Sequence, residues 1–210
     1  MSKVLFSLLG TSVTAVVGYI LFKNNSTSNP EKTFKNQYPE AILKAESNLW
    51  NSKFKSLKDG GQPTHATLAL AKSKIGNDET EAKTLHRRGC EEIYNSKFKE
   101  TAYLNDFQLY CSKNLKDVIT TPKTWITDDN TKGNKWDSKL TSLSTHDTQQ
   151  GELDESLSAL KTTLSQLSQK TWTNEHRKNL KDWCDAAQTS IFSGDKELKF
   201  IHAGLYCMEG

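Results

Sequence analysis

The sequence lacks the short motifs that identify the common classes of enzyme. No HExxH, GxSxG or GxGxxG motif and no phosphate-binding Walker loop occurs among its 210 residues. We therefore predict that the protein is not an enzyme and that it holds no cofactor. The same absence means that no motif identifies the molecule on which the protein acts.

The chain also has little excess of either charge. It carries 28 Lys and Arg residues against 25 Asp and Glu residues, and the balance is almost even once Lys3 and Lys23, which flank an N-terminal apolar run, are left out. A nucleic-acid-binding surface needs several Lys or Arg side chains gathered on one face. The basic cluster at 83–88 is more typical of a solvated helix face, so we predict no nucleic-acid partner.

Cysteine is scarce, and its spacing excludes two further roles. The four cysteines are Cys90, Cys111, Cys184 and Cys207. No two of them have the separation of two to four residues that is typical of zinc ligands, so we expect no metal. None lies near the N-terminal apolar run, which excludes attachment of a lipid to a cysteine there.

One segment resembles a calcium-binding loop but fails in detail. Residues 128–133 begin like such a loop, yet Lys132 and Lys139 stand where an oxygen ligand and a bidentate glutamate are needed. We predict a polar turn.

The pairing of His86 with Cys90 has the spacing of a base and a nucleophile on one helix face. The second half of the chain does not repeat it, because Leu180 stands four residues before Cys184.

We interpret the histidines at 65, 86, 146, 176 and 202 as surface or helix-end residues. Trp125 is either an exposed contact residue or a residue packed between domains.

The longest apolar stretch is at 4–22 and contains no charge. Nineteen residues of α-helix are about 28 Å long, close to the roughly 30 Å hydrocarbon core of a bilayer. We predict a tail at 1–3, a single transmembrane anchor at 4–22 that makes the membrane a partner, and a flexible stalk at 23–37. A cleaved signal peptide is one alternative, although bulky residues and Lys23 end the run. A buried core helix is another, although a mean hydropathy of −0.68 leaves little core to hide it.

The rest of the chain contains an internal repeat. Trp50 opens the stretch WNSKFKSL and Trp136 opens WDSKLTSL, and each stretch is followed by a lone cysteine and then by Leu-Tyr-Cys. The two tryptophans are 86 residues apart, the two first cysteines 94 and the two second cysteines 96. We predict helical repeat 1 at 38–120, a linker at 121–135 and helical repeat 2 at 136–210, with Trp50 and Trp136 as core anchors.

Apolar residues recur at helical steps of three and four in both repeats. The pattern covers 42–57, 82–93 and 104–118 in the first repeat and 153–167, 180–191 and 198–208 in the second. No segment of the body has the alternation typical of a strand. We predict an all-α fold in which an N-terminal transmembrane helix precedes two small, duplicated helical-bundle modules.

The cysteine positions fit helical hairpins. Cys184 and Cys207 lie at similar distances from a turn near 193–195, and Cys90 and Cys111 do so if their turn lies near 99–101. We predict the disulfides Cys90–Cys111 and Cys184–Cys207; the alternative is four buried free thiols. Because disulfides persist outside the cytosol, they favour a single-pass protein of the cell membrane with an extracellular body. The charges that flank the apolar run are too balanced to decide its orientation.

Several features together resemble one group of proteins. The opening Met-Ser-Lys with its apolar run, the stalk rich in Asn, Ser and Lys, the Trp-x-Ser-Lys elements and the Leu-Tyr-Cys pairs are similar to the large paralogous families of uncharacterised membrane-anchored proteins in hemotropic mycoplasmas. The resemblance covers most of the chain. It implies a body that faces the host, a role in adhesion or antigenic variation, and a host-surface protein or an antibody as partner. It implies no active site.

Two other functions are compatible with the sequence. An exported hydrolase would gather acids and histidines in a cleft only in the folded chain. A structural spacer in a membrane complex would expose an apolar patch for its neighbours.

Overall fold

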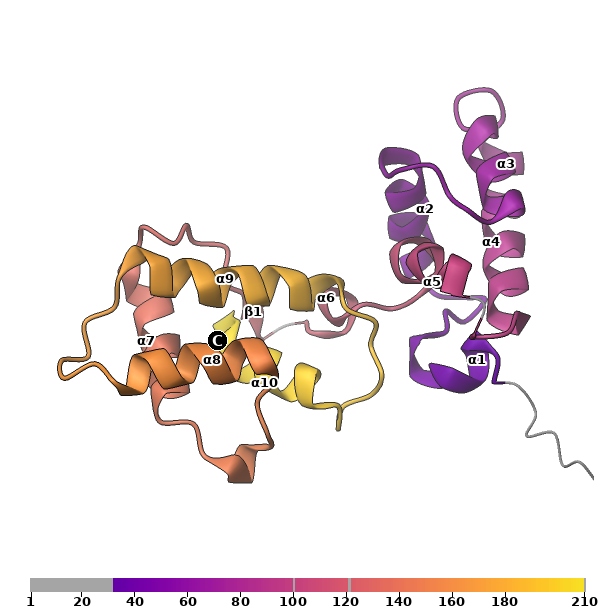
Figure 1. Cartoon of the computed structure of the whole chain (residues 1–210). Helices are drawn as coiled ribbons and strands as arrows, with labels where there is room; N and C mark the ends of the chain where they lie inside the picture. The colour runs from indigo at the N-terminus through magenta and orange to yellow at the C-terminus, as the bar shows by residue number, and fades with distance from the viewer. Residues whose placement is uncertain (1–31, 100, 121, 210) are drawn as a thin grey trace, which may run out of the picture. The chain divides into compact units, whose positions relative to one another are not determined.

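The computed structural model describes residues 32–99, 101–120 and 122–209, and these residues are mostly helical, as predicted (Figure 1). The α-helices are α1 (Phe34–Gln37), α2 (Leu49–Asp59), α3 (Ala66–Lys74), α4 (Glu79–Asn95), α5 (Leu104–Asp106), α6 (Leu115–Val118), α7 (Gly133–Ser144), α8 (Glu155–Ser165), α9 (Asn174–Thr189) and α10 (Leu198–Tyr206). Shorter elements are the 3-10 turns η1 (Pro39–Ala41), η2 (Thr101–Tyr103) and η4 (Thr148–Gln150), the π-helix η3 (Phe107–Cys111) and the strands β1 (Thr124–Trp125) and β2 (Met208–Glu209).

The predicted tail at 1–3 and the predicted anchor at 4–22 lie outside the described residues. Within the part of the chain that the structure describes, no helix has the length and apolar character needed to cross a bilayer.

Buried apolar side chains form two clusters, which we call the first core and the second core. The first core includes Phe34, Trp50, Phe54, Leu57, Leu68, Ile93 and Phe107. The second core includes Leu115, Trp136, Leu140, Leu143, Leu157, Leu180 and Tyr206. In the second core α7, α8, α9 and α10 pack on one another.

In the first core α3 packs along α4, and the two helices lie side by side in Figure 1. Gly89 on α4 permits this close approach. A Cβ at Gly89 would lie 2.8 Å from Cδ2 of Leu68, closer than packed carbon atoms come.

The continuous helix predicted across 104–118 is wrong. The chain passes through η2, α5 and η3 up to Cys111, and Ser112 then takes an extended conformation with φ −117° and ψ 157°. Asn114 starts the separate helix α6 with a capping box, in which its backbone N–H donates to Oδ2 of Asp117 at 2.8 Å. The apolar period continued through the break, but Asn114 favours a helix start over a helix interior.

The predicted end of repeat 1 at 120 is too late. Leu115 is fully buried in the second core, and Val118 and Ile119 pack against the same core. The chain therefore crosses from the first core to the second at 112–114. Periodicity marks an apolar helix face but does not identify the core that this face enters.

The predicted linker at 121–135 is also wrong in part. Ile126 is buried in the second core, and α7 already begins at Gly133. Strand β1 pairs antiparallel with β2, with Trp125 opposite Met208. This short pairing contradicts the expectation that the body has no strand; two residues are too few to show an alternation in sequence.

The predicted stalk at 23–37 lies outside the described residues up to residue 31, and the prediction is wrong for the part that follows. Phe34 on α1 is fully buried in the first core, where its ring packs against Phe98 and Phe107 at centroid distances of 5.4 and 5.0 Å. The Phe34 N–H donates to the carbonyl of Ser96 at 3.2 Å. Tyr38, four residues later, packs on Phe107 as well, so two aromatic side chains hold this segment against the first core.

The crossing segment 112–114 is hydrogen-bonded on both sides. The Lys113 N–H donates to the carbonyl of Ala41 at 2.8 Å, and the Lys113 carbonyl accepts from the N–H of Phe192 at 2.9 Å. Beside it, the Leu115 N–H donates to the carbonyl of Ser190 at 3.0 Å. Backbone bonds thus tie this segment to the end of η1 and to the loop after α9.

A buried ion pair lies next to the crossing segment. Lys53 on α2 is 2% exposed, and its Nζ lies 2.6 Å from Oδ2 of Asp117 and 2.5 Å from Oδ1 of Asn114. Burial is the main effect on Lys53 and lowers its pKa, while the bond to Asp117 opposes that shift. The ammonium thus has two oxygen partners in place of water, as a buried charge requires.

Candidate functional site

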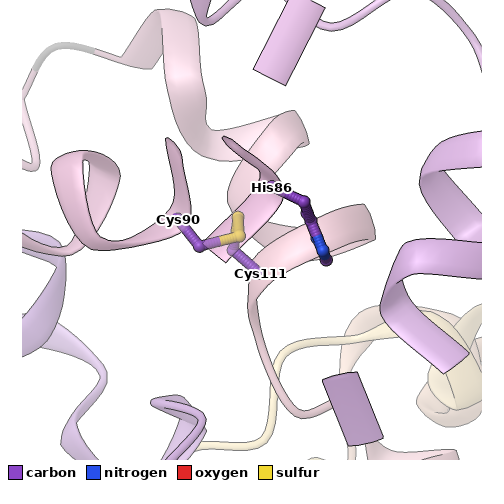
Figure 2. Close-up of side chains that lie close together, drawn as sticks. All are labelled: His86, Cys90 and Cys111. Atoms are coloured by element: carbon purple, nitrogen blue, oxygen red, sulfur yellow. A yellow bond between two sulfur atoms is a disulfide. The ribbon is translucent and has the colours of Figure 1, made fainter. Parts of the chain in front are cut away.

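The cysteine cluster of the first core combines α4 with the end of η3. Cys90 lies on α4 and Cys111 ends η3, and the structure joins them in a disulfide with a Cα–Cα distance of 5.2 Å. Figure 2 shows the ring of His86 beside this bond. The bond is the one that the sequence predicts.

The three side chains have the proximity of metal ligands but not the chemistry. The ligand atoms of His86, Cys90 and Cys111 lie within 4.8 Å of one another. A metal takes cysteine as the thiolate, and both sulfurs are bonded to each other here. The oxidised cluster therefore offers no thiolate to a metal or to a substrate.

His86 acts within this cluster as a structural donor. It is buried, contrary to the expected surface or helix-end position, and its ring Nε2 lies 2.9 Å from the Tyr110 carbonyl. Because a carbonyl only accepts, Nε2 carries the proton and donates. Burial, the largest effect, lowers the pKa of His86 and favours the neutral ring.

The second core holds the matching disulfide. Cys184 on α9 joins Cys207, which directly follows α10, with a Cα–Cα distance of 5.5 Å. Leu180, one turn before Cys184, is fully buried where the first core has His86. The two cysteine clusters thus share their disulfide but not their polar neighbour.

The predicted core anchors Trp50 and Trp136 are both buried, at 6% and 0% exposure. Each indole N–H donates to a backbone carbonyl that precedes its helix: Trp50 Nε1 to Lys44 at 2.8 Å, and Trp136 Nε1 to Asp128 at 3.0 Å. These bonds satisfy the one polar atom of each indole. Trp125 is half-buried against the second core, so it is packed within one core rather than exposed for contact.

Two further histidines, one just after α7 and one on α10, form a cluster that the sequence did not indicate. His146 and His202 are buried, with ring centroids 5.5 Å apart. His146 donates through Nε2 to the Gly151 carbonyl at 2.8 Å and accepts at Nδ1 from the Tyr206 hydroxyl at 2.6 Å. Burial raises the pKa of Tyr206 to about 12, which keeps that hydroxyl protonated. Both nitrogens of His146 are therefore occupied within the fold.

A third polar cluster surrounds His65. Its backbone N–H donates to Oδ2 of the buried Asp106 at 2.7 Å, and its Nε2 lies 3.8 Å from Oε2 of Glu92. Glu92 in turn accepts from the Thr67 hydroxyl at 2.5 Å. Burial is the main cause that raises the pKa of Asp106. These contacts tie the start of α3 to α4 and α5, while Nδ1 of His65 is buried without a hydrogen-bond partner among the described residues.

The segment at 128–133 forms a polar turn, as predicted. The Thr131 N–H donates to Oδ1 of Asp129 at 2.8 Å, and Asp128 pairs with Lys135 at 3.3 Å. Its carboxylates are thus engaged by the chain itself.

The structure confirms both predicted disulfides and the burial of Trp50 and Trp136. Sequence analysis missed the burial of Lys53 and of the histidines His86, His146 and His202. Comparisons with protein-family models, with curated proteins and with solved structures found no match.

Proposed function

We propose that the protein is an exported, membrane-anchored surface protein that acts by binding through two disulfide-stabilised helical modules. The observation that carries this proposal is the matched disulfide in each core: each bond joins a long helix, α4 or α9, to the cysteine of a Leu-Tyr-Cys sequence. Disulfides persist in oxidising compartments, which supports an exported body. The apolar run at 4–22 supplies the proposed anchor.

We further propose that the two modules derive from one duplicated unit. Matching bonds support this origin, since Trp50 and Trp136 each donate to the carbonyl of a residue that precedes their helix. In both modules, moreover, the sulfur of the first cysteine lies near the carbonyl of the tyrosine before the second cysteine, at 3.6 Å for Cys90 and 3.8 Å for Cys184.

The helix surfaces support a role in display. Exposed faces carry opposite charges one turn apart, as in Lys83–Glu79 at 2.6 Å on α4 and Lys178–Asp182 at 2.5 Å on α9. Such pairs contribute little to stability, so the residues on these faces can vary at little cost to the fold. The partner that we propose, from the resemblance to surface proteins of hemotropic mycoplasmas, is a host-surface protein or an antibody.

The topology of the full chain tests the first part of this proposal. Intact cells that express it are treated with a maleimide that cannot cross membranes, before and after reduction, and then with a protease. We expect labelling of the four cysteines only after reduction, and digestion of the body from outside. No labelling even after reduction, together with a body that resists protease until the cells are lysed, would contradict export.

Adhesion tests the second part. Proteoliposomes that carry the full chain are mixed with red cells, and protein-free liposomes of the same lipid composition serve as control. We expect binding above the control that is lost when the disulfides are reduced, because the modules depend on them. Binding equal to the control would contradict adhesion while leaving the topology result intact, and antibody recognition would then be the surviving role.

A further inference from the structure

An apolar groove of about 410 Å³ lies in the second module between the end of α6 and α10. Its apolar lining is Val118, Ile119, Phe200, Ile201 and Leu205, all of them half-buried. Small-molecule sites in proteins commonly enclose roughly 300–1,000 Å³ and are lined mostly by apolar side chains. The groove has the size and the lining of such a site.

Gly204 leaves the groove open. It lies on α10, where an alanine would favour the helix by roughly 0.5–1 kcal/mol. The nearest atom to a Cβ at this position would be Nζ of Lys123, at 3.9 Å, which is an ordinary contact. The fold therefore has room for a side chain here, and its absence keeps the apolar wall accessible.

The mouth of the groove is positively charged. Lys123 lines it and is exposed, and among the described residues no carboxylate lies within ion-pair distance of its ammonium. Lys139 on α7 is half-buried nearby; burial is the main cause that lowers its pKa, and the charge of Lys123 adds to the effect. The negative charge of Glu209 raises the pKa of Lys139, but Glu209 already forms an ion pair with Lys135 at 2.7 Å.

The internal repeat makes the missing carboxylate notable. Lys139 follows Trp136 by three residues, just as Lys53 follows Trp50. Lys53 has a carboxylate partner from the chain, since Asp117 lies 2.6 Å from its Nζ. In the second module the corresponding ammonium has no such partner among the described residues, and it lies close enough to Lys123 for the two charges to act on each other.

We propose that the groove binds a free long-chain fatty acid, with its hydrocarbon chain on the apolar wall and its carboxylate at Lys123. An uncharged lipid would leave the two ammonium groups unmatched, and a small anion would leave the apolar wall exposed to water. This site lies within the described body and does not depend on the location or the adhesion partner proposed above.

A photoreactive fatty acid tests the site in the full chain. Membranes that contain the protein are incubated with a diazirine-bearing palmitate analogue, irradiated and digested, and the labelled peptides are mapped by mass spectrometry. The mapping separates the groove from any label on the apolar run at 4–22. We expect label on the peptides that contain 118–120 and 198–206, and stronger competition by unlabelled palmitate than by hexadecanol.

Variants at Gly204 supply a matched pair. Gly204→Leu fills the groove with a side chain that suits a helix, and we expect labelling of the groove peptides to fall at least tenfold. Gly204→Ala adds one methyl group where there is space and should keep the label. Lys123→Gln removes one ammonium and should weaken competition by palmitate about 1.5- to 5-fold, the range for an exposed ion pair. Circular dichroism of each variant shows whether the fold is retained.

The length of the competitor tests the hydrocarbon contact. Each methylene that is fully buried strengthens binding about fourfold, so we expect shortening palmitate by two carbons to weaken competition roughly four- to fifteenfold. Labelling that is unchanged in Gly204→Leu, or hexadecanol that competes as well as palmitate, would overturn the proposal. It would also be overturned if chemical cross-linking placed a second copy of the chain over the groove, because the apolar wall would then be an interface.

Discussion

Breaking either disulfide should lower the free energy of unfolding by about 3 kcal/mol. The bonds close loops of 21 and 23 residues. Because the entropy that a cross-link removes from the unfolded chain grows with the logarithm of loop length, these loops correspond to about 3.3 and 3.4 kcal/mol at 25 °C. Reducing both bonds removes about 7 kcal/mol, comparable with the roughly 5–15 kcal/mol of a typical domain. We therefore expect the fully reduced protein to unfold under mild conditions.

Two double variants isolate the bonds. Cys90→Ala with Cys111→Ala leaves only the second disulfide, and Cys184→Ala with Cys207→Ala leaves only the first. Each variant, as the full chain in one detergent, is compared with its own reduced form by urea unfolding followed through tryptophan fluorescence. The sequence does not change within a comparison, so the cost of the cavity left by alanine cancels.

The expected loss lowers the urea midpoint by roughly 1–3 M for a typical slope of 1–3 kcal/mol/M. A loss below about 0.5 kcal/mol in either variant, in samples whose alkylation pattern shows the bond before reduction, would refute the chain-entropy reasoning. Losses that differ between the variants by more than about 2 kcal/mol would show that packing around the sulfurs, rather than loop closure, sets the contribution.

Three further predictions concern single side chains, each measured by urea unfolding. Lys53→Met leaves the Asp117 carboxylate buried without its partner and should cost about 3–5 kcal/mol; adding Asp117→Asn should recover part of the loss, whereas costs that simply add would contradict a coupled pair. In the unfolded chain the imidazole of His86 takes up a proton near pH 6.5, whereas burial lowers its pKa in the folded chain. Stability should therefore fall as the pH drops below about 6.5, by at most about 1.4 kcal/mol per pH unit for this residue. His86→Leu should flatten that dependence, and an unchanged slope would assign it to other groups. Gly151→Ala and Gly76→Ala, at φ +92° and φ +98°, should each cost about 1–2 kcal/mol, because the only crowded neighbour of the methyl group added at Gly151 is the terminal Cδ2 of the exposed Leu198, which can turn aside; a clearly larger cost for Gly151→Ala would contradict this reasoning.

The sequence predicted most helices because their apolar faces are continuous. Trp50, Phe54 and Leu57 recur at steps of three and four, and α2 buries all three. The positions of the four cysteines relative to the hairpin turns also predicted both pairings, since two cysteines at one height of a hairpin lie within disulfide reach.

The parts that sequence analysis missed depend on contacts between distant segments. Lys53 lies three residues after Trp50 and four before Leu57, so its helical position already indicated that it is buried. Its partner Asp117 is 64 residues away, and no local pattern predicts that pairing. Phe34 and Tyr38 stand four residues apart and both pack on Phe107, but two positions are too few to establish a helical period. The burial of His146 follows from its bond to Tyr206, 60 residues later, which no local pattern encodes.

The disulfides also limit how far the chain can be stretched. A force that pulls on the chain from both sides of a disulfide passes through the sulfur–sulfur bond and bypasses the residues between the cysteines. The loops closed by Cys90–Cys111 and Cys184–Cys207 span 21 and 23 residues, and each would otherwise add roughly 70–80 Å of extended chain. In a protein tethered at one end and attached to a partner at the other, α10 would then lie inside a loop that carries no tension, while α2, α3, α7 and α8 would extend first.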